Sequence, residues 1–307
     1  MNSDIIKAEK LISSYSDEIK SKGFAVSGIT RKQYNYEISI SRKDTKIKLL
    51  VYFGKKGIST IIQGNKDSGL YGEIAGLIFG ESFIRNSSHE IDEPDVYLGT
   101  DESGKGDYFG PLVIAGVFID KETSDRFKKL GVKDSKELSD NVIKKYAEEI
   151  KSTVGDKYEI ISISPPRYNE LYAKIGNVNR ILGWAHARVL ENLLERCPAS
   201  EAISDKFGDE KLIINSLQEN GKKIVLHQFT KAERFTAVAA ASVLARDKFN
   251  GWFDKKKKEL KINLLKGASA EVEKLAAKIM AEKGEKYLYE IAKVHFKTTA
   301  KIIRSNY

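Results

Sequence analysis

Two adjacent carboxylates, Asp101 and Glu102, follow a short apolar run at residues 96–100. A turn with three glycines and a proline comes next, and a second apolar run occupies residues 112–119. Both runs are typical of buried strands. Neighbouring residues of a strand point to opposite faces. The two carboxylates therefore share a site only if the backbone turns there, which the glycines permit.

A charged pair at this place has two interpretations. It could belong to a solvated hairpin loop. Its flanks are apolar, however, and a carboxylate at the edge of a buried strand costs free energy unless it is compensated. The glycines do not form a nucleotide-binding loop, because GxGxxxG over residues 104–110 is one residue too long and precedes a strand. The pattern GxxxxGK[ST] is absent from the chain.

Residues 101–113, DESGKGDYFGPLV, closely resemble the opening motif of the type 2 ribonucleases H. They are most similar to the ribonuclease HIII branch, and the DEAGRGP-type opening of ribonuclease HII is a looser match. The resemblance implies that Asp101 and Glu102 are the first two metal-binding carboxylates. It also implies that the turn formed by Gly104, Lys105 and Gly106 lies against the RNA strand at the scissile position.

Two later segments resemble the remaining catalytic segments of that family. A strand over residues 201–205 is expected to end at Asp205, which the resemblance makes the third catalytic carboxylate; the alternative is a turn cap. The sequence TKAE, followed by AVAAASVLARD, resembles the fourth segment and implies that Glu233 completes the set. Asp247 is the alternative fourth carboxylate, although its resemblance is to a structural position.

A lysine is the other expected substrate contact. Residues 134–138, DSKEL, resemble the DSKxL segment of the family, which places Lys136 near a substrate phosphate. Alternatively, Lys136 is a surface charge, and Ser135 or Ser139 caps the helix that continues through Ile150. His186 lies within a helix expected over residues 179–195, and with no second histidine four residues later we interpret it as structural.

Composition sets further bounds on the protein. A chain of 307 residues predicts two domains. The single cysteine excludes a disulfide framework or a cysteine zinc site, and the four histidines are scattered. A net charge of +9 favours a polyanionic partner. No apolar run is long enough to span a bilayer, and the first residues lack a signal-peptide core, so we expect a cytoplasmic monomer with no membrane contact.

The first 84 residues predict a small α+β domain. A helix is expected over residues 4–21 and again over 71–84, with antiparallel strands between them that leave one face of the sheet free. Residues 31–56 hold eight lysines and arginines against two acids. The basic face is either a solvated surface or a nucleic-acid platform, because ribonuclease HIII carries a TATA-binding-protein-like domain at this position. Residues 85–95 are expected to form a linker.

The expected architecture is therefore an α/β protein in two parts. Residues 96–307 would form a ribonuclease H-like catalytic domain, a mixed sheet flanked by helices, and residues 1–84 a smaller TATA-binding-protein-like substrate-binding domain. Four clustered carboxylates would repel one another and raise each other's pKa values. Hard oxygen ligands without histidine or cysteine favour Mg²⁺ or Mn²⁺, and two such ions about 4 Å apart can cleave a phosphodiester.

These features predict hydrolysis of the RNA strand of an RNA–DNA hybrid, with 5′-phosphate and 3′-hydroxyl ends, as the resemblance also implies. The alternatives are ribonuclease HII-like incision at single ribonucleotides in duplex DNA, another carboxylate-metal nuclease, or a catalytically silent nucleic-acid-binding protein. Retention of all four carboxylates argues against silence. The glycine turn argues against DNA nucleases, which have no need of a loop shaped around a ribose.

Overall fold

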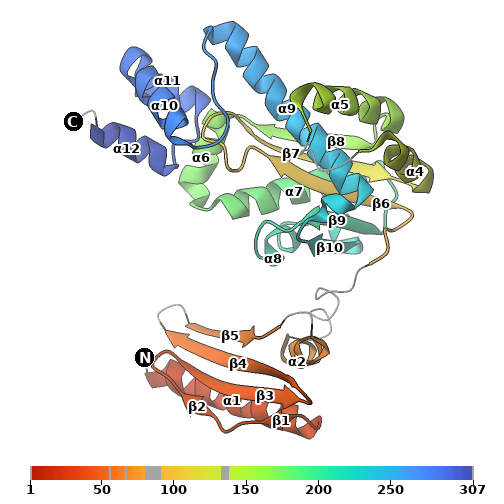
Figure 1. The fold of residues 1–307 in the computed structure, drawn as a ribbon, viewed down its shortest axis with the longest axis vertical. Coiled ribbons are helices and arrows are strands. Elements are labelled where there is room, and N and C mark those ends of the chain that lie inside the picture. Colours follow the sequence, from red (N-terminus) through yellow and green to blue (C-terminus); the bar gives the residue numbers. More distant parts are fainter. Residues whose placement is uncertain (1, 55–56, 66–67, 80–90, 133–137, 306–307) are drawn as a thin grey trace. The chain divides into compact units, whose positions relative to one another are not determined.

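The computed structural model describes residues 2–54, 57–65, 68–79, 91–132 and 138–305. The chain divides into two compact units, Met1–Asp92 and Glu93–Tyr307 (Figure 1). Residues 85–90 of the expected linker lie outside the described residues. Glu93, near the end of that expected linker, is held within the second unit, where its carboxylate accepts the Thr236 N–H at 2.7 Å. No helix in the described ranges is long and apolar enough to cross a membrane.

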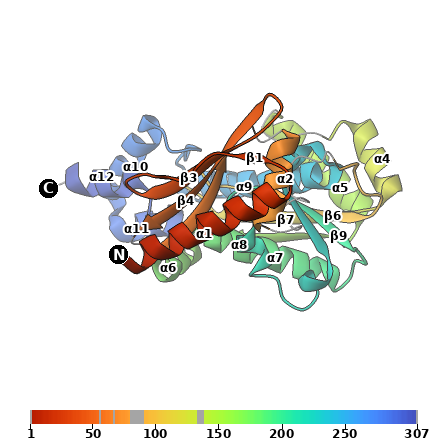
Figure 2. The same ribbon diagram turned by 90° about the horizontal axis from the view of Figure 1, so that it is seen from below.

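The first unit is an antiparallel sheet with its helices on one face. Its elements are α1 (Asn2–Ser21), β1 (Ala25–Val26), β2 (Thr30–Arg31), β3 (Asn35–Arg42), β4 (Thr45–Gly54), β5 (Gly57–Gln63) and α2 (Gly69–Phe79). The strands pair in the order β1-β3-β4-β5, with β2 also on β3. Figure 2 shows α1 lying across the strands. Alternate apolar residues of β3 and β4, such as Ile38 and Leu49, face the helices and form the core.

The other face of this sheet carries lysines, as expected, but also an acid and apolar groups. Lys46 and Lys48 are exposed, while Ile47 between them is buried on the helix side. Glu37 lies 3.6 Å from the Lys48 ammonium, and it stands in register with Leu50 and Ile61. The face therefore mixes positive charge with apolar surface.

The second unit is a mixed sheet flanked by helices, which confirms the expected fold class. Its strands are β6 (Tyr97–Ser103), β7 (Leu112–Ile119), β8 (Tyr158–Ile163), β9 (Glu201–Asp205) and β10 (Val225–Phe229). They pair in the order β10-β9-β6-β7-β8. β7 is antiparallel to β6 and β8, whereas β9 is parallel to β6 and β10. Every residue of β7 is buried, which explains its continuous apolar run.

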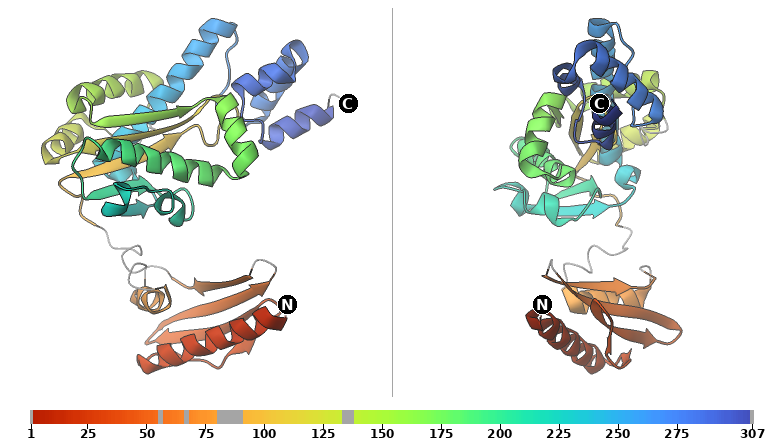
Figure 3. Two further views of the ribbon diagram at one scale, coloured as in Figure 1. Left: turned by 180° about the vertical axis from the view of Figure 1, so that it is seen from behind. Right: turned by 90° about the vertical axis from the view of Figure 1, so that its left-hand side faces the viewer.

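Helices connect and cover these strands. They are α4 (Lys121–Leu130), α5 (Asp140–Val154), α6 (Pro165–Ile175), α7 (Val178–Leu194), α8 (Lys211–Ile214), α9 (Thr236–Leu260), α10 (Ala270–Lys283), α11 (Glu285–Ile291) and α12 (Lys297–Ser305), with 3₁₀ turns η2 (Gly221–Lys223) and η3 (Ala232–Arg234). α9 packs on one face of β6 and β7 beside α4 and α5, and α7 packs on the opposite face (Figures 1 and 3).

Two glycines allow these central helices to approach the sheet closely. A Cβ on Gly99 of β6 would lie 2.3 Å from the backbone of Ala237 in α9. A Cβ on Gly116 of β7 would lie 2.4 Å from the side chain of Val189 in α7. Odd-numbered residues of β6 therefore face α9, and even-numbered residues face α7.

The backbone does not turn between Asp101 and Glu102, so that expectation is corrected. β6 continues through Ser103, because Asp101, Glu102 and Ser103 pair in register with Ala115, Ile114 and Val113 of β7. The bend begins one residue later, at Gly104, whose φ is +92°. The two carboxylates thus leave the strand toward opposite faces of the sheet.

Candidate active site

Asp101 and Asp205 occupy neighbouring strands at the same level. β6 and β9 run parallel, and their last paired residues are Thr100 and Ser204, each directly before its aspartate. β9 ends at Asp205, and the Asp205 Oδ1 accepts the Ala232 N–H at 3.0 Å. Parallel pairing therefore brings together two acids that are more than one hundred residues apart in the sequence.

Asp101 is buried in this arrangement. Its Oδ1 accepts the Glu102 N–H at 2.8 Å, and Ser242 of α9 also hydrogen-bonds to its side chain. Burial raises the pKa of Asp101 well above its usual value, and the charges of Glu102 and Asp205 raise it further. The two hydrogen bonds offset only part of this effect. Asp101 is thus a carboxylate that the fold holds at a cost in free energy when it is ionised.

Glu102 lies on the α7 face, and its neighbour there is a histidine that the sequence did not assign to the site. The His186 Nε2 is 3.3 Å from the Glu102 Oε2, and both atoms are buried without a hydrogen-bond partner in the described structure. The His186 Nδ1 lies 2.9 Å from the Thr100 Oγ1. The only sequence feature that could have indicated this contact is a polar side chain among the inward-facing apolar residues of α7.

Glu233 lies in η3 and is partly buried. It directly follows Ala232, whose N–H binds Asp205. Glu233 therefore follows directly in the chain the residue that holds Asp205. Within the described ranges, no three carboxylate, imidazole or thiol groups are already close enough to hold a metal ion together.

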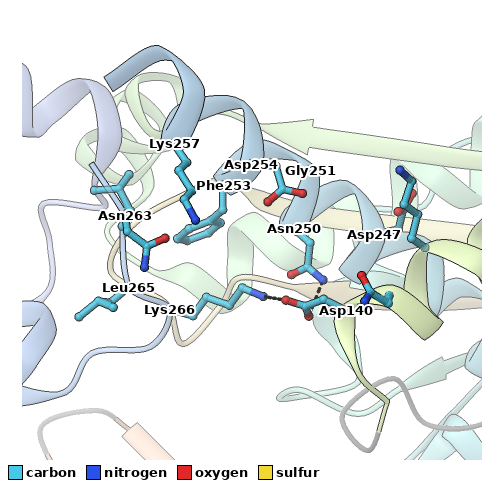
Figure 4. Close-up of a pocket in the computed structure, with 13 residues that line it drawn as sticks. Asp140, Asp247, Asn250, Gly251, Phe253, Asp254, Lys257, Asn263, Leu265 and Lys266 are labelled. Carbon is cyan, nitrogen blue, oxygen red and sulfur yellow. Dashed lines mark hydrogen bonds and ion pairs between the residues drawn. The ribbon is translucent and has the colours of Figure 1, made fainter. Parts of the chain in front are cut away.

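Asp247, the alternative fourth carboxylate, has a partner of its own. Its Oδ2 lies 2.9 Å from the ammonium of Lys151 in α5. It lines a cavity of about 580 Å³ with Asp140, Asn250 and Lys266, between α5, α9 and the segment that follows α9 (Figure 4). The ion pair accounts for Asp247 without a metal.

The glycines of the turn differ in what the fold demands of them. A Cβ on Gly104 would lie 2.2 Å from the Pro111 carbonyl oxygen and would also collide with Phe249. A Cβ on Gly106 would meet nothing within 4 Å, and its φ is not positive. The fold therefore requires glycine at position 104 but not at position 106.

The structure describes one of the two lysines that were predicted to contact substrate. The Lys105 ammonium donates to the Phe207 carbonyl oxygen at 3.2 Å and lies 5.3 Å from the centre of the Phe207 ring. Phe207 is two residues beyond Asp205, so the contact links the turn to the third carboxylate's strand. Lys136 lies outside the described residues.

The far end of the turn is anchored by the C-terminal segment. The buried Lys293 donates to the Gly110 carbonyl oxygen at 2.6 Å, and the Asp107 Oδ1 accepts the Gly267 N–H at 2.6 Å. Burial lowers the pKa of Lys293 to about 7, against a smaller opposing effect of Asp107. The C-terminal segment therefore fixes where residues 107–110 lie.

Comparison with known proteins places these features in a family. The family model described as Ribonuclease HII matches residues 98–299. A ribonuclease HIII of Protochlamydia amoebophila is 41% identical over 218 residues, which is 70% of this chain and 72% of that protein. A ribonuclease HIII of Chlamydia felis is 35% identical over 295 residues, covering 94% of this chain and 93% of that protein.

Solved structures show the same similarity. Bst-RNase HIII, crystallised in complex with Mn²⁺, superposes with a TM-score of 0.63 at 27% identity and covers 94% of this chain and 95% of that one. Aquifex aeolicus RNase H3 has a TM-score of 0.53 at 28% identity and covers 93% of this chain and 96% of that one. Both similarities extend over the two units.

Proposed function

The chain belongs to the ribonuclease HII family and is a ribonuclease H of the HIII type, and we propose that it hydrolyses the RNA strand of RNA–DNA hybrids with divalent cations. The observation that carries the proposal is the buried Asp101, with Glu102 and Asp205 close enough to raise its pKa. A carboxylate buried beside two further acids that raise its pKa costs free energy, and such a shifted group is typical of a functional site. Glu233 is the proposed fourth ligand.

The residues present fit a divalent cation. Every proposed ligand is a carboxylate, and such hard oxygen donors select Mg²⁺ or Mn²⁺ over zinc. Bst-RNase HIII, a structural relative, was crystallised with Mn²⁺. A pair of such ions, when bound, would activate a water and stabilise the leaving 3′-oxygen.

The chain's own contribution is to orient these carboxylates. Ser242 of α9 holds Asp101, and the Ala232 N–H holds Asp205, so both acids are fixed from the same face of the sheet. Glu102 comes from the opposite face. The acids would therefore flank a scissile phosphate at the end of β6, and cleavage would leave a 5′-phosphate and a 3′-hydroxyl.

We assign recognition of the ribose to the turn Gly104–Lys105–Gly106. The 2′-hydroxyl distinguishes RNA from DNA, and a backbone without a Cβ can approach it closely. The open space around Gly106 supports this role, whereas Gly104 serves the bend itself. Lys105 would contact an adjacent phosphate, and Lys136 is proposed to do the same.

We assign substrate affinity to the first unit, as a TATA-binding-protein-like domain over residues 1–84. The exposed Lys46 and Lys48 on the free sheet face could neutralise phosphates of the hybrid. Action as a cytoplasmic monomer also remains a prediction.

A cleavage assay tests the proposed function. Three duplexes of one sequence are compared, with Mg²⁺ and with Mn²⁺: an RNA–DNA hybrid, all-DNA, and DNA containing one ribonucleotide. We expect the hybrid to be cut fastest, all-DNA to stay intact, and a chelator to stop the reaction. Preferred cutting at the single ribonucleotide would indicate the ribonuclease HII-like alternative. Binding of the hybrid without any cleavage would support the silent nucleic-acid-binding alternative.

A further inference from the structure

A fully buried histidine lies against one of the proposed metal ligands. His186 is on the face of α7 that packs on β6, and its side chain has no exposed surface. Burying an imidazole costs free energy unless its nitrogens find partners. The Thr100 Oγ1 lies 2.9 Å from Nδ1, and the Glu102 Oε2 lies 3.3 Å from Nε2. The shortest contact of each ring nitrogen is thus with an oxygen of β6.

The surroundings fix the orientation of this ring. It stacks on Phe207, with ring centres 4.9 Å apart and planes inclined by 26°. The Ser204 Oγ of β9 makes a second, longer contact with Nδ1, at 3.5 Å. α7 itself begins at a defined place, because the Asn177 side chain accepts the N–H groups of Asn179 and Arg180. A ring so confined presents Nε2 to Glu102 in one direction.

The chemistry of the two oxygens determines which nitrogen carries the hydrogen. An ionised carboxylate only accepts hydrogen bonds. The nitrogen that serves Glu102 must therefore be Nε2–H, and in the neutral ring Nδ1 then accepts from the Thr100 hydroxyl. Thr100, His186 and Glu102 thus form a relay of hydrogen-bonding groups, in which Thr100 donates to Nδ1 and Nε2–H points to the Glu102 carboxylate. A small rotation of the carboxylate would complete its last hydrogen bond.

We propose that His186 is a positioning residue that holds Glu102 Oε2 and leaves Oε1 directed toward a divalent cation. The inference rests on the proposed role of Glu102 as a metal ligand. Such a residue is needed because Glu102 leaves β6 on the face opposite to Asp101 and Asp205. A carboxylate with two free oxygens would sample many orientations there, and partners behind a metal ligand reduce that freedom.

The test is a calorimetric titration of the full chain with Mn²⁺ in the absence of nucleic acid. His186→Leu removes the donor at similar volume, whereas His186→Gln keeps an N–H at the end of the side chain. We expect His186→Leu to weaken Mn²⁺ binding by about 10- to 100-fold and His186→Gln to restore most of it. Val189→Ala, buried one turn along α7, is the matched control, expected to lower the melting temperature but not the affinity.

Thr100→Val gives a second, independent variant if His186→Leu does not fold. It preserves shape but removes the hydroxyl that orients the ring, so we expect a smaller loss of Mn²⁺ affinity. In the double variant the two losses should not add. Unchanged affinity in both His186→Leu and Thr100→Val, or weakening that Val189→Ala reproduces, would overturn the positioning role.

Glu102→Gln separates this inference from the proposed function. If Glu102→Gln weakens Mn²⁺ binding while folded His186→Leu does not, only the positioning role fails. If Glu102→Gln binds Mn²⁺ as the wild type does, Glu102 is not a ligand, and both the proposed metal site and the relay are refuted.

Discussion

The two units differ in where they place ionisable groups. In the described part of the first unit, the buried polar side chains are Ser16 and Asn35, and the charged groups lie nearer the surface. The second unit buries Asp101, Glu191 and Lys293. Burying a charge costs free energy unless it is paired or hydrogen-bonded. The second unit therefore carries strain that the first one avoids, as expected if one performs chemistry and the other provides affinity.

Burial alone does not identify a catalytic group, as a comparison within the second unit shows. The Glu191 carboxylate accepts three backbone N–H groups, from Gln218, Asn220 and Gly221, at 2.6–3.1 Å. Its burial is thus compensated, and its role is to fix the loop before β10. Asp101 instead lies beside other acids that raise its pKa. The presence of neighbouring acids, and not burial by itself, therefore distinguishes Asp101 from Glu191.

The largest effect is expected from Asp101→Asn. The asparagine Oδ1 can still accept the Glu102 N–H, but the buried charge is gone. We expect hybrid cleavage to fall by several orders of magnitude while the metal-free protein becomes more stable. Because the pKa of Asp101 is raised in the fold, ionisation destabilises the folded state at neutral pH. Each pKa unit removed corresponds to about 1.4 kcal/mol. Thermal denaturation and a cleavage assay measure the two effects.

Asp247→Asn is the matched control for Asp101→Asn. It breaks the ion pair with Lys151, so a small loss of stability with preserved cleavage is expected. Loss of both stability and cleavage in Asp101→Asn would mean that Asp101 is structural. Loss of cleavage in Asp247→Asn with retention in Glu233→Gln would reverse the assignment of the fourth carboxylate.

The two turn glycines should separate stability from activity. Gly104→Ala places a Cβ against the Pro111 carbonyl at a positive φ, so we expect a loss of about 2–4 kcal/mol in the free energy of unfolding. Gly106→Ala should leave stability unchanged but reduce kcat/KM on the hybrid by up to about 100-fold. Urea unfolding and steady-state kinetics provide the measurements. Wild-type activity in Gly106→Ala would show that the turn does not read the ribose through this residue.

The lysines on the free sheet face of the first unit should contribute to hybrid binding by neutralising substrate phosphates. Lys46→Gln with Lys48→Gln in the full chain should weaken hybrid binding by a few-fold at low salt. Each lost phosphate contact should reduce the slope of log K against log salt by about 1. Binding is measured by fluorescence anisotropy from 50 to 200 mM salt. The double variant Lys144→Gln with Lys145→Gln on α5 removes the same charge from the second unit and serves as the control. An identical salt slope in the two double variants would show that the free sheet face has no specific role in binding.

Much of the site could be predicted from sequence because its parts follow local patterns. Asp205 was expected at the end of a strand, and β9 ends there. That Asp205 lies beside Asp101 could not be predicted, because no local sequence pattern specifies that β9 pairs with β6 rather than with another strand. The turn was expected directly after Asp101 because the glycines alone suggested it. Pairing with β7 instead extends β6 through Ser103.

Tertiary contacts explain the other differences. The alanine-rich run stops at Ala245, yet α9 continues to Leu260. Its second half buries Phe249 and Phe253, which pack against the turn at Gly104 and Gly110. His186 was interpreted as structural because no second histidine follows four residues later, and no sequence pattern shows that α7 lies against the face of β6 that carries Glu102. Long-range packing, absent from local patterns, decides both.

The last prediction concerns Lys293, the buried cation that holds the far end of the turn. An unfolded lysine keeps its proton up to about pH 10.4, whereas burial lowers the pKa of Lys293 to about 7 in the fold. Between these values the unfolded state binds more protons, so stability should rise with pH across this window, by at most about 1.4 kcal/mol per pH unit. Below pH 7 both states are charged, and the contribution is constant.

Lys293→Met removes this titration while preserving the aliphatic stem. Urea unfolding at pH 6.5, 7.5, 8.5 and 9.5 should give a flatter stability profile for Lys293→Met than for the wild type. Lys297→Met, an exposed change in the same segment, should keep the wild-type slope. Other ionisations affect all three proteins alike, so the difference between profiles isolates Lys293. Parallel profiles would mean that this lysine remains charged in the fold, and the strain in the second unit would then belong to its carboxylates alone.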